Sequence, residues 1–201
     1  MIKVLELFSG TRSIGKVCDQ LGWESYSVDL ISDADFKGDI MDFDYKQFPK
    51  DYFDIVWASP PCTEYSKAKS VGKRDIEGAN KIVLKTIEII KYFNCQYWFI
   101  ENPQTGLLKH QCFMKDFNFV DGDYCMYGLP YRKRTRFWTN KECKLFLCDK
   151  KCGSFIDGRH IGSAGCGGQG KGHTKSYSNK SYSLSEKYSI PEDLIFSLFL
   201  E

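Results

Sequence analysis

The stretch Asp54-Ile55-Val56-Trp57-Ala58-Ser59-Pro60-Pro61-Cys62 decides the fold of this chain of 201 residues. Its apolar run, residues 55–58, predicts a strand that is buried on both faces of a sheet. The two prolines end the strand, because neither has an N–H to donate to a sheet ladder. Cys62 then follows the carboxyl end of a parallel strand, where open α/β sheets bind their ligands. A thiol on such a stiff loop is a candidate nucleophile, and a buried structural cysteine is the alternative.

Strands and helices are expected to alternate on both sides of this stretch. We predict strands at 3–8, 24–28, 36–40 and 97–100, a helix from about Ser13 to Gly22 and a long helix at about 75–93. Residues 119–125 and 135–139 predict two more strands, which would pair antiparallel. This order predicts an α/β fold with a doubly wound, mostly parallel sheet and an antiparallel strand pair at one edge.

The composition is that of a globular protein, with 42% hydrophobic and 27% charged residues. No apolar run approaches the roughly 20 residues that span a bilayer, so we expect no membrane association. The first residues lack the long apolar region of a signal peptide, which predicts an intracellular protein of the cytoplasm or nucleus. Its nine cysteines are then expected to be free thiols or metal ligands.

Charge is spread unevenly along the chain. Residues 131–180 hold 12 Lys and Arg against 3 Asp and Glu, whereas residues 1–130 hold 15 against 19. A basic segment on a mildly acidic body predicts a surface for a polyanion, and the aromatic residues of this segment favour a nucleic acid. A solvated lysine-rich surface is the alternative.

Three further segments carry candidate site residues. Gly10 lies in a tight turn between a strand and a helix, where backbone N–H groups can face a ligand, and Asp29 ends the next strand, where an acid can accept hydrogen bonds from ribose. A plain strand–helix turn is the alternative. Glu101 ends the strand expected beside that of Cys62, so it can hold or protonate a heteroatom that gains electron density on attack, unless it is a capping or surface residue. Arg134 and Arg136 alternate on one strand and suit a phosphate or an extruded base, unless they only protect a sheet edge.

Taken in order, these residues resemble the cytosine 5-methyltransferases. The segments that match are Phe8-Ser9-Gly10, Ser59-Pro60-Pro61-Cys62, Glu101-Asn102-Pro103 and Arg134-Thr135-Arg136. The resemblance covers about residues 1–140 and implies a Rossmann-like methyltransferase sheet. It also implies methyl transfer from S-adenosylmethionine to carbon 5 of cytosine in DNA, through a covalent cysteine adduct.

The resemblance implies a role for each matching residue. Cys62 would attack carbon 6 of the base, Glu101 would hold or protonate ring nitrogen 3, and Arg134 and Arg136 would help to hold the base and its phosphate. The residues implied to bind the cofactor are Phe8, Ser9, Gly10, Thr11, Asp29, Asp39, Ile40 and Pro60. An RNA cytosine methyltransferase and a catalytically weak nucleic-acid-binding protein that acts with a partner are the alternatives.

The rest of the chain departs from the family pattern. We predict a catalytic domain at 1–140, a basic, Gly- and Cys-rich loop segment at 141–182 and a closing helix at 183–201 packed on the catalytic domain. The middle segment is short for a target-recognition region, so a protein partner or self-association could complete target recognition. Within it, Cys148, Cys152 and His160 are zinc candidates, and scattered reduced cysteines are the alternative.

Overall fold

The computed structural model describes residues 1–162 and 182–200. Its main sheet has seven strands in the order β3-β2-β1-β4-β5-β7-β6. The pairs from β3 to β5 are parallel, and β7 pairs antiparallel with both β5 and β6. The strand bounds are β1 Lys3–Leu7, β2 Glu24–Asp29, β3 Phe36–Lys37, β4 Ile55–Ala58, β5 Tyr97–Pro103, β6 Phe119–Asp123 and β7 Arg134–Thr139. The predicted fold class is confirmed.

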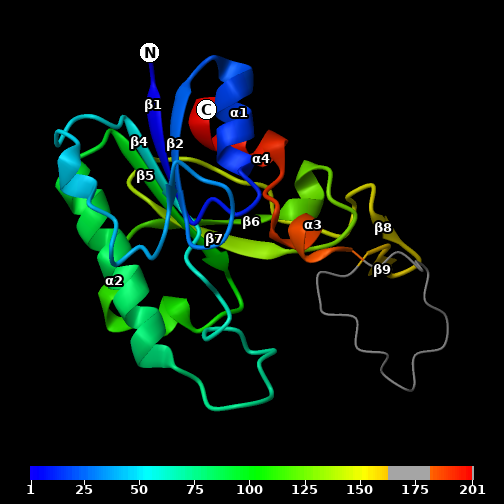
Figure 1. The fold of residues 1–201 in the computed structure, drawn as a ribbon. Coiled ribbons are helices and arrows are strands. Elements are labelled where there is room, and N and C mark those ends of the chain that lie inside the picture. Colours follow the sequence, from blue (N-terminus) through cyan, green and yellow to red (C-terminus); the bar gives the residue numbers. More distant parts are fainter. Residues whose placement is uncertain (163–181, 201) are drawn as a thin grey trace.

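Helices cover both faces of this sheet. Helix α2 (Ile76–Phe93) lies along one face, and α1 (Ser13–Leu21) and α4 (Glu192–Leu200) lie together on the other (Figure 1). The short helix α3 (Leu184–Tyr188) and a small hairpin of β8 (Phe155–Ile156) and β9 (Arg159–His160) lie beyond the β6–β7 edge. Within the described ranges no helix combines the length and the apolar character needed to cross a membrane.

Strand β4 shows why the sheet is buried on both sides. Val56 and Ala58 belong to the core cluster under α2, whereas Ile55 and Trp57 belong to the cluster under α1 and α4. All four side chains are at most 4% exposed, because successive residues of a strand point to opposite faces and both faces are covered. Burial of this run on both faces is therefore confirmed.

The long helix α2 forms where its apolar spacing predicts a helix. Its buried positions Ala79, Val83, Ile87 and Ile90 recur at helical spacing and face the sheet. Asp75 caps the helix by accepting a hydrogen bond from the N–H of Gly78 at 2.8 Å. Asn94 ends it in the left-handed conformation.

The order of the sheet creates a topological switch point between β1 and β4. From β1 the chain proceeds to β2 and β3 on one side, whereas β4 is followed by β5 on the other. The N–H of Ser59 donates to the carbonyl of Leu7 at 3.2 Å, so the segments that follow these two strands begin side by side. Ligand sites of open α/β sheets form at such a point.

Candidate active site

The Cys62 loop is fixed to the sheet at two places. The side-chain amide of Asn102, at the end of β5, donates to the carbonyl of Pro60 at 2.9 Å. Tyr65 is fully buried, its hydroxyl donates to Asn80 at 2.7 Å, and its carbonyl accepts from the N–H of Leu107. These contacts join the segments that follow β4 and β5, so Cys62 has a defined position between them.

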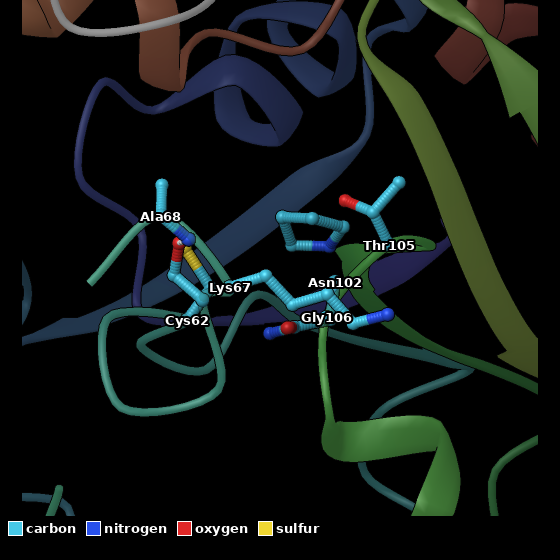
Figure 2. A pocket seen from close by; sticks show the side chains of 8 residues that line it. Cys62, Lys67, Ala68, Asn102, Thr105 and Gly106 are labelled. Carbon is cyan, nitrogen blue, oxygen red and sulfur yellow. Dashed lines mark hydrogen bonds between the residues drawn. The ribbon is translucent and has the colours of Figure 1, made fainter. Parts of the chain in front are cut away.

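A cavity of about 260 Å³ opens beside the thiol. In Figure 2, Cys62 lies with Lys67 and Ala68 of the loop after β4, whereas Asn102, Thr105 and Gly106 come from the end of β5 and the turn after it. This volume is near the lower limit of ligand pockets, which suits a single ring rather than a larger ligand.

Glu101 is buried on β5 next to a tyrosine and a lysine. The hydroxyl of Tyr124 donates to Oε1 of Glu101 at 3.3 Å, and Nζ of Lys133 lies 3.9 Å from the same oxygen. Nζ of Lys133 also lies 4.7 Å from the ring centre of Tyr124. Burial, followed by the nearby charge of Glu101, raises the pKa of Tyr124 well above its ordinary value, so this hydroxyl remains a hydrogen-bond donor.

Both charges of the Glu101–Lys133 pair affect the pKa of the Cys62 thiol. Burial is the main cause that raises its pKa, the carboxyl group of Glu101 raises it further, and the ammonium of Lys133 lowers it. Strands β4 and β5 are parallel neighbours, and Asn102, next to Glu101, holds Pro60 of the Cys62 loop, so the ends of the two strands lie together. The cation that favours the thiolate comes from Lys133.

Arg134 and Arg136 lie away from Glu101. In the β5–β7 pair, Phe137 is opposite Glu101 and Arg136 is opposite Asn102, so the even-numbered arginines point to the other face of the sheet. Arg136 donates two hydrogen bonds to Asp121, at 2.7 and 2.9 Å, and Nε of Arg134 lies 3.5 Å from Asp123. The structure does not join these arginines to Glu101.

The turn that is predicted to bind the cofactor follows β1, across the switch point from Cys62, which follows β4. Phe8 and Gly10 have positive φ values of 62° and 48°, and the N–H of Gly10 donates to Asp29 at 2.9 Å. Burial raises the pKa of Asp29, but hydrogen bonds from the N–H groups of Ser32, Ile31 and Gly10 outweigh it, so the net pKa is lowered and the carboxylate stays charged.

The other predicted cofactor residues line the same side of the fold. Ser9 is buried, and its hydroxyl oxygen has no hydrogen-bond partner among the described residues. Thr11 shares a hydrogen bond of 2.9 Å with Ser13, and Pro60 is held by Asn102. Asp39 is exposed and accepts from the N–H of Met41, and Ile40 beside it is 5% exposed. A charged residue next to a buried apolar one suits an adenosine group.

Glu6 fills the N-terminus of helix α1, a feature the sequence analysis missed. Its carboxyl group accepts hydrogen bonds from the N–H groups of Ile14 at 3.1 Å and Gly15 at 3.0 Å. Burial raises its pKa from 4.5 to about 7. These N–H groups are the ones that bind phosphate in dinucleotide folds, and here they are already used. The site therefore fits a nucleoside cofactor with a cationic centre better than one with a pyrophosphate.

The zinc candidates also lie together. Cys148, Cys152 and His160 surround one point, and the structure adds Cys125 to them. The sequence offered one signal for this fourth residue, a cysteine at the end of the predicted strand 119–125.

Comparison with known proteins agrees with this geometry. The sequence profile of the C-5 cytosine-specific DNA methylase family matches residues 16–119, which include Cys62 and Glu101. A protein named "Probable DNA (cytosine-5)-methyltransferase" from Frog virus 3 (isolate Goorha) is 38% identical over 156 residues. That match covers 70% of this chain and 72% of the viral protein.

Two solved structures share the fold. A methyltransferase of Entamoeba histolytica, EhMeth, matches with a TM-score of 0.54 and 16% identity, over 74% of this chain and 57% of its own. A protein described as a prophage-encoded DNA modification methyltransferase (E. coli) matches with a TM-score of 0.52 and 14% identity, over 69% and 46%. This chain thus spans about half the length of these structures. By sequence profile, by its viral relative and by the placement of Cys62 and Glu101, the chain belongs to the C-5 cytosine-specific DNA methylase family.

Proposed function

We propose that this protein transfers a methyl group to carbon 5 of cytosine in DNA, with Cys62 as the nucleophile. The observation that supports this best is the position of the thiol. It borders a ring-sized cavity, and its pKa is affected by the charges of Glu101 and Lys133. A buried acid, a nearby cation and an adjacent cavity are features of a nucleophile's surroundings, and a cysteine that only packs in the core requires none of them.

The chemistry has to overcome the poor nucleophilicity of carbon 5. The thiolate of Cys62 bonds to carbon 6, and the electron pair of the 5,6 double bond makes carbon 5 nucleophilic. Carbon 5 then takes a methyl group from a sulfonium donor, whose carbon–sulfur bond breaks and which would depart as a neutral thioether. Loss of the proton on carbon 5 and expulsion of the Cys62 thiolate restore the double bond.

Glu101 and Lys133 would act on the charge that this attack creates. Glu101 would give a proton to ring nitrogen 3, where electron density rises when the thiolate attacks. Lys133 contributes the positive charge that offsets Glu101 and favours the thiolate. We assign to Lys133 the part expected of Arg134 and Arg136, because its Nζ lies 3.9 Å from Glu101.

S-adenosylmethionine fits the residues of the switch point as the methyl donor. It supplies an activated methyl group on a sulfonium. Asp29 and Asp39 would accept hydrogen bonds from its ribose and adenine groups, Ile40 would contact the adenine, and the turn at Phe8, Ser9 and Gly10 would face the amino-acid part. The buried hydroxyl of Ser9 has no hydrogen-bond partner among the described residues, and a polar ligand at this turn would supply one.

A base has to leave the helical stack to reach the cavity. Extrusion costs a few kcal/mol in a duplex and less in a single strand. Lys67 at the cavity and the basic segment that begins at Arg132 supply positive charge for the phosphates. These charges bind RNA as well as DNA, so the experiment has to include both.

The test measures methyl transfer from labelled S-adenosylmethionine to duplex DNA, single-stranded DNA and RNA. We expect the wild type to label carbon 5 of cytosine in DNA, Cys62→Ser to label nothing, and Cys112→Ser, which changes an exposed cysteine outside the cavity, to match the wild type. Wild-type protein should also form a stable adduct with DNA that contains 5-fluorocytosine. Activity of Cys62→Ser near the wild-type rate would overturn the mechanism, and labelling of RNA alone would overturn the substrate.

A further inference from the structure

Four side chains outside the active site converge as a metal site would require. The sulfur atoms of Cys148 and Cys152 are 3.6 Å apart, and Nε2 of His160 lies 3.4 Å from the first and 3.3 Å from the second. With Cys125, all four ligand atoms lie within 4.8 Å of one another. The three cysteines are at most 9% exposed.

The three separations among Cys148, Cys152 and His160 are close to the edges of a zinc tetrahedron. With Zn–S bonds of about 2.3 Å and a Zn–N bond of about 2.0–2.1 Å, tetrahedral angles place two sulfurs about 3.8 Å apart and a sulfur and a nitrogen about 3.5 Å apart. The separations among Cys148, Cys152 and His160 fall within about 0.3 Å of those values, and the sulfur of Cys125 lies within 4.8 Å of all three. A disulfide between Cys148 and Cys152 would instead need about 2.05 Å between its sulfurs. Four protein ligands leave no open position, which is the arrangement of a structural site rather than a catalytic one.

The ligands come from three separate parts of the chain. Cys125 lies in the short helical turn after β6, Cys148 and Cys152 lie in the loop after β7, and His160 lies on β9, with its ring 5.2 Å from that of Phe155. The apolar cluster at this place consists of the three cysteines with Met126 and Phe155 at its edge. So small a core cannot hold this loop by burial of apolar surface alone, whereas a bound metal can.

A buried carboxylate links this cluster to the segment around Lys133, just before β7. Asp123, which is fully buried, accepts a hydrogen bond from the N–H of Cys148 at 2.8 Å and another from Arg132 at 2.9 Å. The N–H of Tyr124 donates to the carbonyl of Lys133 at 3.1 Å. The cluster is therefore tied to the residues on both sides of Lys133 and to Tyr124, the partner of Glu101.

We propose that Cys125, Cys148, Cys152 and His160 bind one structural Zn²⁺, which anchors the loop after β7 to the main sheet. Binding removes the protons of the three thiols, so metal uptake releases protons to solvent. The inference does not depend on the proposed function, because it rests on ligand geometry alone.

The metal content of the full chain tests this proposal. Protein purified under reducing conditions without chelators should hold one zinc per chain by elemental analysis. Cys125→Ser should lose most of it, and Cys143→Ser, in the same segment but outside the cluster, should keep it. Wild-type protein without zinc, or equal zinc in both variants, would overturn the proposal.

A second measurement does not require the variants to fold. Cobalt(II) added to metal-free wild-type protein should give the intense visible absorption of a tetrahedral centre and a near-ultraviolet band from thiolate ligands, and one equivalent of zinc should abolish both. A spectrum of hexahydrated cobalt, unchanged by the protein, would contradict the site. A Cys148–Cys152 disulfide in protein kept reduced throughout would contradict it as well.

Discussion

The side-chain nitrogen of Lys133 lies 3.9 Å from Oε1 of Glu101, next to the buried ring of Tyr124. This pair places a cation and an acid on one face of the sheet beside the candidate nucleophile. We therefore expect Lys133 to affect the reaction differently from its arginine neighbours, and the difference can be measured.

Lys133→Gln should reduce the rate of methyl transfer by about 10²–10³-fold, the usual cost of removing one group that stabilises developing charge. Lys133→Arg should retain more activity because it keeps the charge. The pH dependence of the rate should also move to higher pH in Lys133→Gln, because the cation lowers the pKa of Cys62. Lys144→Gln, which removes an exposed charge of the same basic segment, is the matched control. An unchanged rate in Lys133→Gln would assign no catalytic part to this residue.

Glu101→Gln should have opposite effects on chemistry and on thiol reactivity. Methyl transfer should fall, because the amide of glutamine cannot transfer a proton to ring nitrogen 3 when the thiolate attacks. Alkylation of Cys62 by iodoacetamide should become faster at pH 8, because the charge of Glu101 raises the pKa of the thiol and the variant lacks that charge. Mass spectrometry of the Cys62 peptide over a pH series measures this rate. Slower alkylation in Glu101→Gln would show that the two groups do not interact as the structure indicates.

Arg136→Met should destabilise the fold by about 1–3 kcal/mol and leave the turnover rate of the folded protein near that of the wild type. The arginine donates two hydrogen bonds to Asp121 across β6 and β7, and its guanidinium lies 3.4 Å from the ring centre of Phe119. Urea unfolding of Arg136→Met, Asp121→Asn and the double variant separates the pair interaction from the single effects. A stable but inactive Arg136→Met would restore the role that the sequence predicts for this arginine.

Glu6 should make the folded protein less stable as pH rises. Its pKa is about 7 in the folded state against 4.5 for the ordinary carboxyl group, so the folded state binds the extra proton between these values. The stabilisation is complete below about pH 4.5 and is lost as pH rises through 7, with an upper limit of about 3 kcal/mol. Denaturation at pH 5 and pH 8 should show this loss in wild type and in Glu24→Gln, an exposed control, but not in Glu6→Gln. An equal loss in Glu6→Gln would assign the effect to other groups.

The buried strands could be located from sequence because burial on both faces produces apolar runs that need no partner to be identified. Ile55 to Ala58 is such a run, and the prolines after it mark the end of the strand that positions Cys62. Glu101 lies near the end of the next parallel strand, β5, so topology places it at the same edge of the sheet as the Cys62 loop.

The side-chain partners at the β6–β7 edge could not be predicted in the same way. Successive side chains of this segment point to opposite faces of the sheet. Only the register against β5 shows that Arg134 and Arg136 point away from Glu101. The sequence analysis did not include Cys125 among the zinc ligands, because it is distant from Cys148 and Cys152 in the sequence and lies beside them only in the folded chain. Glu6 carried a signal, an acid within the buried strand Lys3–Leu7, but its partners on α1 depend on how that helix packs.

The packing of α4 against α1 has a consequence for biosynthesis. The N–H of Ile190 donates to the hydroxyl of Ser13, 177 positions away, and Phe199 packs against Trp57 and Phe99. The core under α2, in contrast, is built from residues between Leu5 and Trp138. A nascent chain can therefore complete one layer early, while the other stays uncovered until α4 leaves the ribosome. We expect stalled chains that end before residue 190 to bind a dye specific for exposed apolar surface, and to lose that binding once residues 190–199 emerge.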